Sequence, residues 1–527
     1  MLAKVFSGSV EGVMAHLVTV EVDVSSGLQV FKVVGLTESM VQEGKVRVET
    51  AFDNSELEFP GRRVTVNLSP ADLRKVGTGF DLPIAVGILA ATGIVPPASL
   101  QGTLFVGELA FDGRLLPVRG VLPFAVAARQ AGLSTIVLPR ASTAEAVVVE
   151  GLTVLGADSL AEVAAHLQGQ APLAPASAPP PDSQPAGHGE WGLDLADVRG
   201  QPLARRALEI AAAGEHSLLF IGPPGTGKTM LARRLPTVMP PLEPEEALEA
   251  SMVYSVRGLL PPGQGLLRHR PFRAPHHTVS AAALVGGGVG MPRPGEISLA
   301  HHGVLFLDEL PEFQRATLDN LRQPLESGVV VVGRSQRTVV FPARFMFVAA
   351  MNPCPCGHFG DPRGLCTCAP GRILAYQDRI SGPLLDRIDL QIEVPALPFR
   401  EIARASAGEP SWTVRARVVA ARERQRQRRQ GRAPFANSQV PPGVLKEAAR
   451  LDASGLRLLE TAMGQLGLSA RSYDRIVRVA RTIADLEGSD EVRTPHVAEA
   501  VQYRRLDRTL AVRPPGSATR PVAASIH

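Results

Sequence analysis

The stretch that most constrains the fold is a glycine-rich loop between a short apolar run and a helical pattern. Leu218 to Ile221 is apolar throughout, as a buried strand is, and a helical pattern begins at Lys228. The loop and the first helical residues are Gly222, Pro223, Pro224, Gly225, Thr226, Gly227, Lys228 and Thr229. Glycines let backbone N–H groups approach phosphates, the lysine reaches the β- and γ-phosphates, and the threonine hydroxyl ligates Mg²⁺. The alternative is a glycine-rich turn that arose by chance, but such a turn would rarely follow a strand, contain the lysine and open a helix. The stretch predicts an α/β fold that binds ATP or a similar nucleoside triphosphate.

Length and composition set the limits for the rest of the chain. At 527 residues the chain is too long for one hydrophobic core, so several domains are expected. No apolar run reaches the ~20 residues needed to span a bilayer, and the N-terminus lacks the features of a secretory signal. We therefore expect a cytoplasmic protein with no membrane partner. The net charge of +4 permits a nucleic-acid partner without demonstrating one.

Composition also suggests the domain boundaries. Residues 1–167 and 190–395 carry strand and helix patterns, whereas residues 396–512 carry helical patterns alone. Residues 168–189 are rich in Pro, Ala, Ser and Gly, which predicts a linker. Residues 513–527 are expected to form a tail without a fixed structure.

The N-terminal region predicts a mixed α/β domain. Val18–Val24 alternates apolar with polar residues, as a half-buried strand does, and Val64–Leu68 repeats that pattern. Ile84–Thr92 is apolar on every side and predicts a buried helix. The run Gly107–Val118, followed by Ala125–Pro139, resembles the proteolytic domain of Lon-type proteases. That resemblance implies a ribosomal S5 domain 2-like fold.

Lon-type proteases use a serine and a lysine as their catalytic dyad. In this chain the serine position falls near Phe80 or Asp81, and the lysine position falls on Leu122. Neither position supplies the nucleophile or the base. The resemblance therefore implies the fold without the protease activity, and a structural or assembly role is expected.

A second nucleotide motif follows the loop along the chain. Residues 304–307 are apolar and predict a buried parallel strand that ends in Asp308 and Glu309. The carboxyl ends of parallel strands are where α/β sheets place ligands. We expect Asp308 to hold Mg²⁺ through water and Glu309 to orient and polarise the attacking water.

Further residues gain roles from resemblance to AAA+ ATPases. Residues 344–352 form a third apolar strand ending in Asn352, which fits the sensor 1 asparagine that hydrogen-bonds near the γ-phosphate. The segment before the loop contains Val198 and Gly200, at positions that line the adenine pocket in AAA+ proteins. A plain packing helix is the alternative for that segment.

The segment Ser381–Asp389 resembles the part of minichromosome-maintenance helicases and magnesium-chelatase motors that carries the arginine finger. The resemblance implies that Arg387 reaches the γ-phosphate bound by the neighbouring subunit and stabilises transition-state charge. Local pairing of Arg387 with Asp386 or Asp389 is the alternative.

Two insertions distinguish this chain from a plain ATPase. The first lies between the two nucleotide motifs and includes Pro271–Thr278 and Gly286–Gly290. The second, Gly328–Phe341, predicts a β-hairpin with Arg334 and Arg337 at its tip. They resemble the helix-2 insert and pre-sensor-1 hairpin of the AAA+ clade with magnesium chelatases and replicative helicases. That implies phosphate contacts for the two arginines; solvated turn charges are the alternative.

All four cysteines lie in one short segment, as Cys354, Cys356, Cys366 and Cys368. Two pairs of thiols separated by a short loop can wrap one tetrahedral Zn²⁺. Such a site would be structural and would brace a loop next to Asn352. Four free or partly oxidised thiols are the alternative.

The C-terminal region predicts a small helical bundle. Residues 444–466 and 471–486 show helical apolar spacing, and residues 415–432 carry eight arginines and one acid. The arginine-rich segment is either a phosphate-binding surface or an ordinary solvated helix. A helical bundle after the core is the AAA+ lid, and Arg471 is our candidate for its sensor 2 arginine, with Arg475 as the alternative.

Taken together, these segments closely resemble the YifB/ComM family of bacterial magnesium-chelatase-like AAA+ ATPases. The resemblance covers nearly the whole chain apart from the linker and tail, and the Cys-Pro-Cys stretch is its most specific piece. It implies a homo-hexameric motor that uses ATP and Mg²⁺ and acts on single-stranded or branched DNA. The implied activity is branch migration or a helicase activity in natural transformation and recombination. A magnesium-chelatase motor and a protein-remodelling ATPase are the alternatives.

Overall fold

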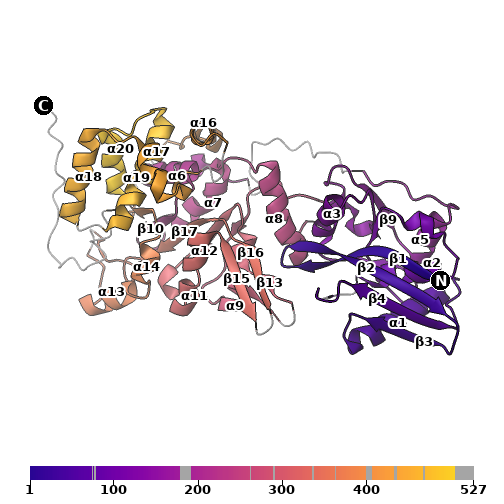
Figure 1. Ribbon diagram of the computed structural model, residues 1–527. Helices are drawn as coiled ribbons and strands as arrows, with labels where there is room; N and C mark the ends of the chain where they lie inside the picture. Colours follow the sequence, from indigo (N-terminus) through magenta and orange to yellow (C-terminus); the bar gives the residue numbers. More distant parts are fainter. Residues whose placement is uncertain are drawn as a thin grey trace.

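The computed structural model describes residues 1–73, 75, 79–177, 192–261, 263–288, 291–334, 337–361, 364–398, 401, 406–431, 436–466 and 469–504. Figure 1 shows an N-terminal α/β domain beside a larger body that contains the C-terminal helices and residues 190–395, the segment predicted to be the ATPase core. The predicted tail and residues 178–189 of the predicted linker lie outside the described residues. Residues 168–177 pack on the N-terminal domain, where Ala176 N–H donates to the Val154 carbonyl at 2.8 Å.

Within the described residues, the N-terminal sheet has seven strands, with β1–β2 and β2–β4 antiparallel and the other pairs parallel. Their order is β3 (Val30–Val34), β4 (Arg63–Ser69), β2 (Met14–Ser25), β1 (Leu2–Glu11), β5 (Thr103–Phe105), β8 (Thr135–Pro139) and β9 (Thr153–Ala157). The helices are α1 (Glu38–Asn54), α2 (Asp81–Ala91), α3 (Val121–Gln130), α4 (Thr143–Ala146) and α5 (Leu160–Leu167). The alternating strands are found in β2 and β4. The all-apolar helix is α2, every residue of which is buried.

The positions compared with a protease dyad are filled by a buried ion pair and an apolar side chain. Arg47 Nε donates to Asp81 Oδ2 at 2.6 Å, and the Leu109 N–H donates to the same oxygen at 3.3 Å. Burial raises the pKa of Asp81 to about 6, although Arg47 opposes the shift. Leu122 is fully buried in the domain. These side chains offer no nucleophile paired with a base.

Within the described residues, the ATPase core contains a five-stranded sheet in which every pairing is parallel. Its order is β11 (Phe272–Arg273), β14 (Val304–Leu307), β17 (Met346–Met351), β10 (Leu218–Ile221) and β18 (Leu390–Glu393). The strands β10, β14 and β17 are apolar along their whole length because helices such as α6 (Pro202–Gly214) and α7 (Lys228–Val238) cover the sheet. Parallel pairing brings the carboxyl ends of β10, β14 and β17 to one edge.

The two segments predicted to be insertions contain helices, short strands and a hairpin. The first contains α8 (Pro244–Arg257), α9 (Ala281–Val285), β12 (Gly286–Gly287), β13 (Arg293–Pro294) and α10 (Glu296–Leu299). The second is the predicted hairpin, β15 (Val329–Arg334) and β16 (Arg337–Pro342), in which the backbones of Arg334 and Arg337 lie opposite each other. The side chains of these two arginines lie outside the described part of the structure.

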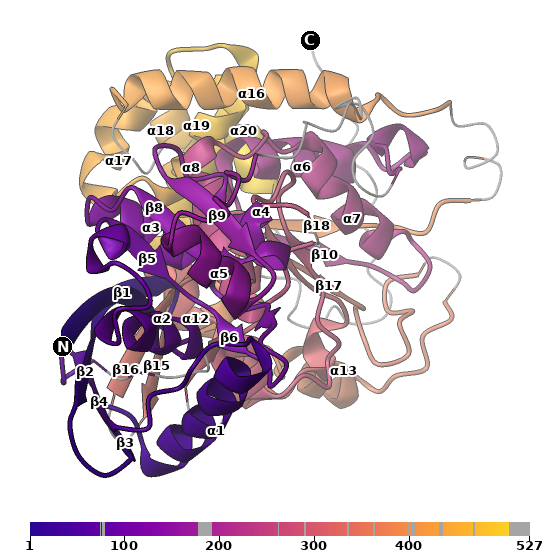
Figure 2. The ribbon, with the colours of Figure 1, turned by 90° about the vertical axis from the view of Figure 1, so that its right-hand side faces the viewer.

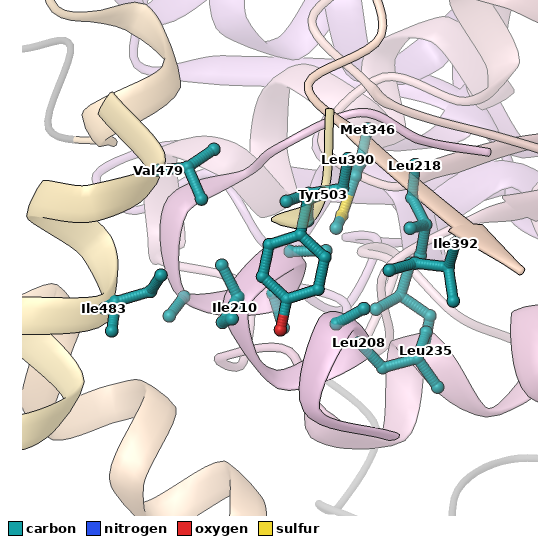
Figure 3. Close-up of a cluster of buried hydrophobic side chains, with 14 of the residues drawn as sticks. Leu208, Ile210, Leu218, Leu235, Met346, Leu390, Ile392, Val479, Ile483 and Tyr503 are labelled. Atoms are coloured by element: carbon teal, nitrogen blue, oxygen red, sulfur yellow. The ribbon is translucent and has the colours of Figure 1, made fainter. Parts of the chain in front are cut away.

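The C-terminal helices are α16 (Ser411–Arg428), α17 (Pro442–Ala449), α18 (Ala453–Leu466), α19 (Ala470–Glu487) and α20 (Thr494–Gln502). Arg450 adopts φ 47° and separates α17 from α18, so the run predicted over residues 444–466 is two helices. Figure 2 shows α16 running along the outside of this bundle. Figure 3 shows α19 side chains packing into the same apolar cluster as α6 and the sheet, with Val479, Ile483, Leu208, Ile210 and Leu218 labelled.

The N-terminal domain is fastened to α8 of the core. The Gly120 N–H donates to the Ser255 carbonyl at 3.1 Å, and the Leu122 N–H donates to the Ser255 hydroxyl at 3.3 Å. That hydroxyl in turn donates to Glu145 at 2.5 Å, and burial raises the pKa of this carboxyl. Among the residues that the structure describes, each helix is too short or too polar to cross a bilayer.

Candidate functional site

The phosphate-binding loop lies at the carboxyl edge of the core sheet, between β10 and α7. Gly225 and Gly227 adopt φ values of 75° and 89°, a left-handed conformation that glycine takes without strain. The Lys228 ammonium donates to the carbonyls of Gly222 (2.7 Å) and Pro223 (2.9 Å) and to Asn352 Oδ1 (3.1 Å). Burial lowers the pKa of Lys228, and the nearby carboxylates oppose that shift. The loop thus holds a buried cation where phosphate oxygens would enter.

The residues expected to hold Mg²⁺ are in contact with each other. Thr229 Oγ1 donates to Asp308 Oδ2 at 2.5 Å, although the two residues lie far apart in the sequence. The Glu309 N–H donates to the other carboxylate oxygen, Asp308 Oδ1, at 2.9 Å. A hydroxyl and a half-buried carboxylate beside a lysine form a donor set that fits Mg²⁺ with a bound triphosphate.

The expected water-polarising residue, Glu309, has a fixed backbone and an exposed side chain. Its φ is 53°, and its carbonyl accepts the Glu312 N–H at 2.8 Å. Its carboxylate lies 3.6 Å from His277 Nδ1. Tyr376 also lies near this carboxylate: burial and the charges of Glu312 and Glu309 raise its pKa to about 12. Neither aromatic side chain could be assigned a role from the sequence, because nothing in the local pattern of His277 or Tyr376 places it beside Glu309.

The expected arginine finger lies elsewhere on the subunit. Arg387 donates to the Pro383 carbonyl at 2.6 Å and pairs with Glu326. Its partner is therefore neither Asp386 nor Asp389, the two carboxylates considered from the sequence. Asp389 instead binds Arg475, whose Nη1 lies 2.5 Å from Asp389 Oδ1.

Strand register places this cluster at the opposite edge of the sheet from the phosphate-binding loop. Asp389 precedes β18 and accepts the N–H of Ser217, the residue before β10, at 3.1 Å. The loop follows the last residue of β10, so the strand separates the two by roughly 13 Å at about 3.3 Å per residue. Arg471 is exposed and lies one helical turn before Arg475.

The six residues expected to act in catalysis therefore fall into two groups. Lys228, Asp308, Glu309 and Asn352 come together at the carboxyl edge of the sheet. The two arginines, Arg387 and Arg471, belong to elements at the amino edge.

The segment considered for the adenine pocket and the arginine-rich helix considered for phosphate binding both make contacts within the chain. Val198 is fully buried, and Gly200 packs against Leu397. Six arginines of α16 bind carboxylates or backbone carbonyls of the chain: Arg415, Arg417, Arg422, Arg424, Arg426 and Arg428. This pairing favours an ordinary structural helix over a phosphate-binding surface.

The four cysteines come together beside the phosphate-binding loop. Their sulfur atoms all lie within 4.8 Å of one another, and the thiols are free. Burial raises the pKa of Cys354 to about 12. Burial would also raise the pKa of Cys356, but hydrogen bonds from the His358 backbone and from Cys354 lower it to about 6. A Cβ atom at Gly357 would lie 2.6 Å from Pro224, so the cysteine loop packs directly on the phosphate-binding loop.

A second cluster, Glu249 with His301 and His302, is less suited to a metal. His301 Nδ1 accepts the Arg344 N–H at 3.0 Å, which places the imidazole proton on Nε2. That nitrogen faces Glu249 at 3.1 Å and donates to it. A metal at this position would have to displace the proton, so the cluster is better described as a hydrogen-bonded network.

The chain matches known proteins over most of its length. Three family models match: "Magnesium chelatase, subunit ChlI" over residues 194–402, "Subunit ChlI of Mg-chelatase" over 20–142 and "Magnesium chelatase, subunit ChlI C-terminal" over 408–504. Competence protein ComM of Haemophilus influenzae is 46% identical over 97% of this chain and 98% of its own length. Protein YifB of Salmonella typhimurium is 45% identical over the same shares. The magnesium-chelatase 38 kDa subunit of Rhodobacter capsulatus is 27% identical over 57% of this chain and 83% of its own.

Proposed function

The chain belongs to the YifB/ComM family of magnesium-chelatase-like AAA+ ATPases, and from that premise we propose that it is an ATP-driven motor acting on DNA. Its proposed output is branch migration or helicase activity during natural transformation and recombination. The printed name of the Haemophilus relative, a competence protein, supports that biological setting. The proposed working form is a homo-hexameric ring.

The observation that carries the proposal is the separation of the catalytic residues into two groups. The residues expected to bind the nucleotide and polarise the water lie at one sheet edge. At the other edge the Arg387 carbonyl accepts bonds from Ser217 and Arg475, and Arg475 lies on α19, the helix that carries Arg471. In a ring, the amino-edge arginines of one subunit can face the nucleotide of the next, which makes each pocket a shared one. Shared pockets couple hydrolysis to movement between subunits.

A second observation supports DNA as the substrate. The β15–β16 hairpin ends at Pro342, and β17 starts at Met346 and runs directly into Asn352. A load on the hairpin is therefore passed along one buried strand to a residue that contacts Lys228. Arg334 and Arg337 are the proposed phosphate contacts at the hairpin tip.

The proposed mechanism uses the chain's own groups at each step. The Lys228 ammonium exchanges its bonds with the Gly222 and Pro223 carbonyls for bonds with phosphate oxygens. Thr229 and Asp308 would hold Mg²⁺, which supplies charge neutralisation on the phosphates. Glu309 then accepts a proton from the attacking water, and Asn352 orients that water. Arg387 of the adjacent subunit stabilises the charge that develops on the γ-phosphate.

The test is an ATPase assay without DNA and with single-stranded, duplex, forked and four-way DNA. The proposal predicts that forked or four-way DNA raises kcat and that Lys228→Ala abolishes hydrolysis on every substrate. Hydrolysis that is equally fast with and without each DNA would overturn the motor proposal. A strand-displacement assay with the stimulating DNA then separates branch migration from hydrolysis alone.

We also propose that the four cysteines hold one structural Zn²⁺. The supporting observation is the gathering of four free thiols within 4.8 Å. With four sulfur ligands no coordination position is open for catalysis, so the ion would brace the loop that packs on Pro224. Elemental analysis of protein purified without chelator should give one zinc per chain, and Cys366→Ser with Cys368→Ser should remove it. Metal-free protein with full ATPase activity would refute the site.

A magnesium-chelatase motor is the second candidate, because a relative that covers 57% of this chain carries that name. ATP-dependent insertion of Mg²⁺ into a porphyrin, with no response of hydrolysis to DNA, would favour it. A protein-remodelling role would instead be supported by a client protein that stimulates hydrolysis after nuclease treatment.

A further inference from the structure

The end of the β1–β2 hairpin extends from the N-terminal sheet to the ATPase core. β1 and β2 pair along their whole length, from Leu2 opposite Asp23 to Glu11 opposite Met14. β4 pairs with β2 over residues 19–25, so residues 8–17 form a two-stranded arm beyond the edge of that pairing. Figure 1 shows this arm reaching from the N-terminal domain toward α8 and β16. The arm is therefore placed to contact the core.

The tip of the arm packs against the β15–β16 hairpin. A Cβ atom at Gly12 would lie 3.2 Å from Val339 Cγ1 and 3.3 Å from the Val340 carbonyl oxygen, so the two backbones approach closely. Val13, the next residue of the turn, is buried in the apolar cluster that also contains Val339. Val339 lies two positions from Arg337, or roughly 7 Å at about 3.3 Å per residue. The contact therefore lies close to the proposed phosphate-binding tip.

The two faces of the β15–β16 hairpin differ in exposure. Val330 and Val339 are 2% and 3% exposed, whereas Val331 and Val340, which lie opposite each other, are 40% and 51% exposed. The side chain that Gly12 meets, Val339, belongs to the covered face. An isolated two-stranded hairpin is only marginally stable in water. The direction of this hairpin therefore depends on the elements that pack on its covered face, and the arm is one of them.

The arm is itself supported by α3 and α8. A Cβ atom at Gly8 would lie 2.7 Å from Phe124 Cδ1, so α3 packs directly on the arm. A Cβ atom at Gly120 would lie 3.1 Å from Val10 Cγ2 and 3.8 Å from Val256 Cγ2, which places the start of α3 between the arm and α8. The hydrogen bonds between α8 and the N-terminal domain lie at the same junction. The arm is thus a supported element and not a free extension.

We propose that the β1–β2 arm positions the β15–β16 hairpin, and that this is a role of the N-terminal domain, whose dyad positions carry neither a nucleophile nor a base. The arm holds the hairpin in one direction, so a load on its tip reaches β17 instead of bending the hairpin. The phosphate-binding loop takes no part in these contacts, so hydrolysis without DNA does not depend on the arm. The inference rests on the proposed function in one respect, that the hairpin is the part that contacts DNA.

The first test adds one methyl group at the contact. G12A places a Cβ atom against Val339 and the Val340 carbonyl. G93A is the matched control, because Gly93 also has a positive φ (82° against 66°), but its added Cβ would meet no described atom within 4 Å. The two variants share the backbone strain, and only G12A disturbs the contact. We expect the backbone amides of β16 to exchange hydrogen roughly tenfold faster in G12A than in G93A, as measured by mass spectrometry without DNA or nucleotide.

The second test removes the apolar character of the tip. V13D places a carboxylate in the apolar cluster, and M14D is its control at the next residue, whose side chain is exposed. V13D should also speed exchange in β16. Its kcat without DNA should stay within about twofold of the unaltered protein, and its DNA-stimulated kcat should fall roughly fivefold. V13L keeps an apolar side chain and should recover most of the loss, and M14D should behave as the unaltered protein does.

The outcomes separate the arm from the motor. Equal exchange of β16 within either pair of variants would overturn the inference. Faster exchange with an unchanged response to DNA would overturn it too, because the arm would then hold the hairpin without affecting its work. If V13D does not fold, G12A and G93A are compared for both exchange and DNA-stimulated kcat, and they decide alone. If DNA stimulates none of the proteins, the motor proposal fails on its own, and the exchange rates still decide whether the arm positions the hairpin.

Discussion

Two arginines one turn apart on α19 allow a direct test of how the lid meets the core. Arg475 binds Asp389 at 2.5 Å and the Arg387 carbonyl at 2.9 Å, and the side chains of the pair are 19% and 7% exposed. Arg471 is exposed, and within the described part of the chain its side chain makes no hydrogen bond or ion pair. We predict that Arg475→Ala loses stability, whereas Arg471→Ala keeps stability and loses hydrolysis.

The size of the first effect follows from the surroundings of Asp389. Removing one partner of a buried ion pair costs about 3–5 kcal/mol. Arg475 is partly solvated, and Asp389 keeps bonds from the Ser217 N–H, the Ser217 hydroxyl and His216 at 3.1, 3.2 and 3.3 Å. We therefore expect a loss of about 2–3 kcal/mol in the free energy of unfolding. At roughly 2–4 °C per kcal/mol, the melting temperature should fall by roughly 4–12 °C.

The pH dependence of this loss has a definite sign. Burial would raise the pKa of Asp389, but Arg475 and His216 hold it well below its ordinary value. A depressed folded-state pKa contributes stability above the unfolded value of about 3.9, and that contribution is lost as pH falls through the folded value. The difference between Arg475→Ala and the unaltered protein should therefore be constant from about pH 6 to about pH 8 and narrow below about pH 4.

The assay is denaturant unfolding followed by fluorescence, with ATP turnover measured on the same preparations. Arg471→Ala should change the free energy of unfolding by less than about 0.5 kcal/mol, as an exposed substitution usually does, and should hydrolyse ATP slowly. Equal stability losses in the two variants would refute the reasoning. Full activity in Arg471→Ala would refute the role proposed for that arginine.

Three further predictions concern the pocket and the core. Lys228→Ala should lose nucleotide binding, whereas Glu309→Gln should keep binding and lose at least about 100-fold in kcat. Titration with a fluorescent nucleotide measures the binding, and phosphate release measures kcat. Weakened nucleotide binding in Glu309→Gln would contradict the role assigned to Glu309. Arg387→Ala subunits mixed with Lys228→Ala subunits should recover part of the ATP hydrolysis, because some interfaces then pair an intact phosphate-binding loop with an intact Arg387. No recovery at any mixing ratio would argue against a shared pocket. Burial lowers the pKa of His301 to about 4, so the unfolded chain binds this proton at a higher pH than the folded chain does. The free energy of unfolding should therefore fall as pH drops from about 6.5 to about 4, by up to about 1.4 kcal/mol per pH unit. In urea titrations, His301→Gln should show a weaker dependence of this free energy on pH, and an unchanged dependence would contradict the assignment.

The parts of the site that could be predicted from the sequence are those formed by contiguous motifs. The strand, loop and helix around Lys228 are neighbours along the chain, so their arrangement is set locally. Asp308 and Asn352 each follow an apolar run, and parallel pairing brings the ends of such strands together. The Thr229–Asp308 contact was therefore predictable although these residues are far apart in the sequence.

The partners of the arginines could not be predicted in the same way. Periodicity indicates which face of a helix is buried, but it does not say which carboxylate on another element lies opposite. Arg387 pairs with Glu326 and not with a carboxylate of its own segment. Arg475 is the arginine of α19 that binds Asp389, and the sequence offered no means of separating its role from that of Arg471.

The sequence by itself determined which short runs carry the predicted triphosphate pocket, the predicted metal-binding carboxylate and the four cysteines, because the geometry of such runs is local. The tertiary structure decided which side chains surround that pocket and which edge of the sheet each arginine occupies. Those features depend on the packing of elements separated by tens to hundreds of residues. His277 is the clearest instance: its neighbours in the chain are prolines and another histidine, and only the pairing of β11 with β14 brings it to Glu309.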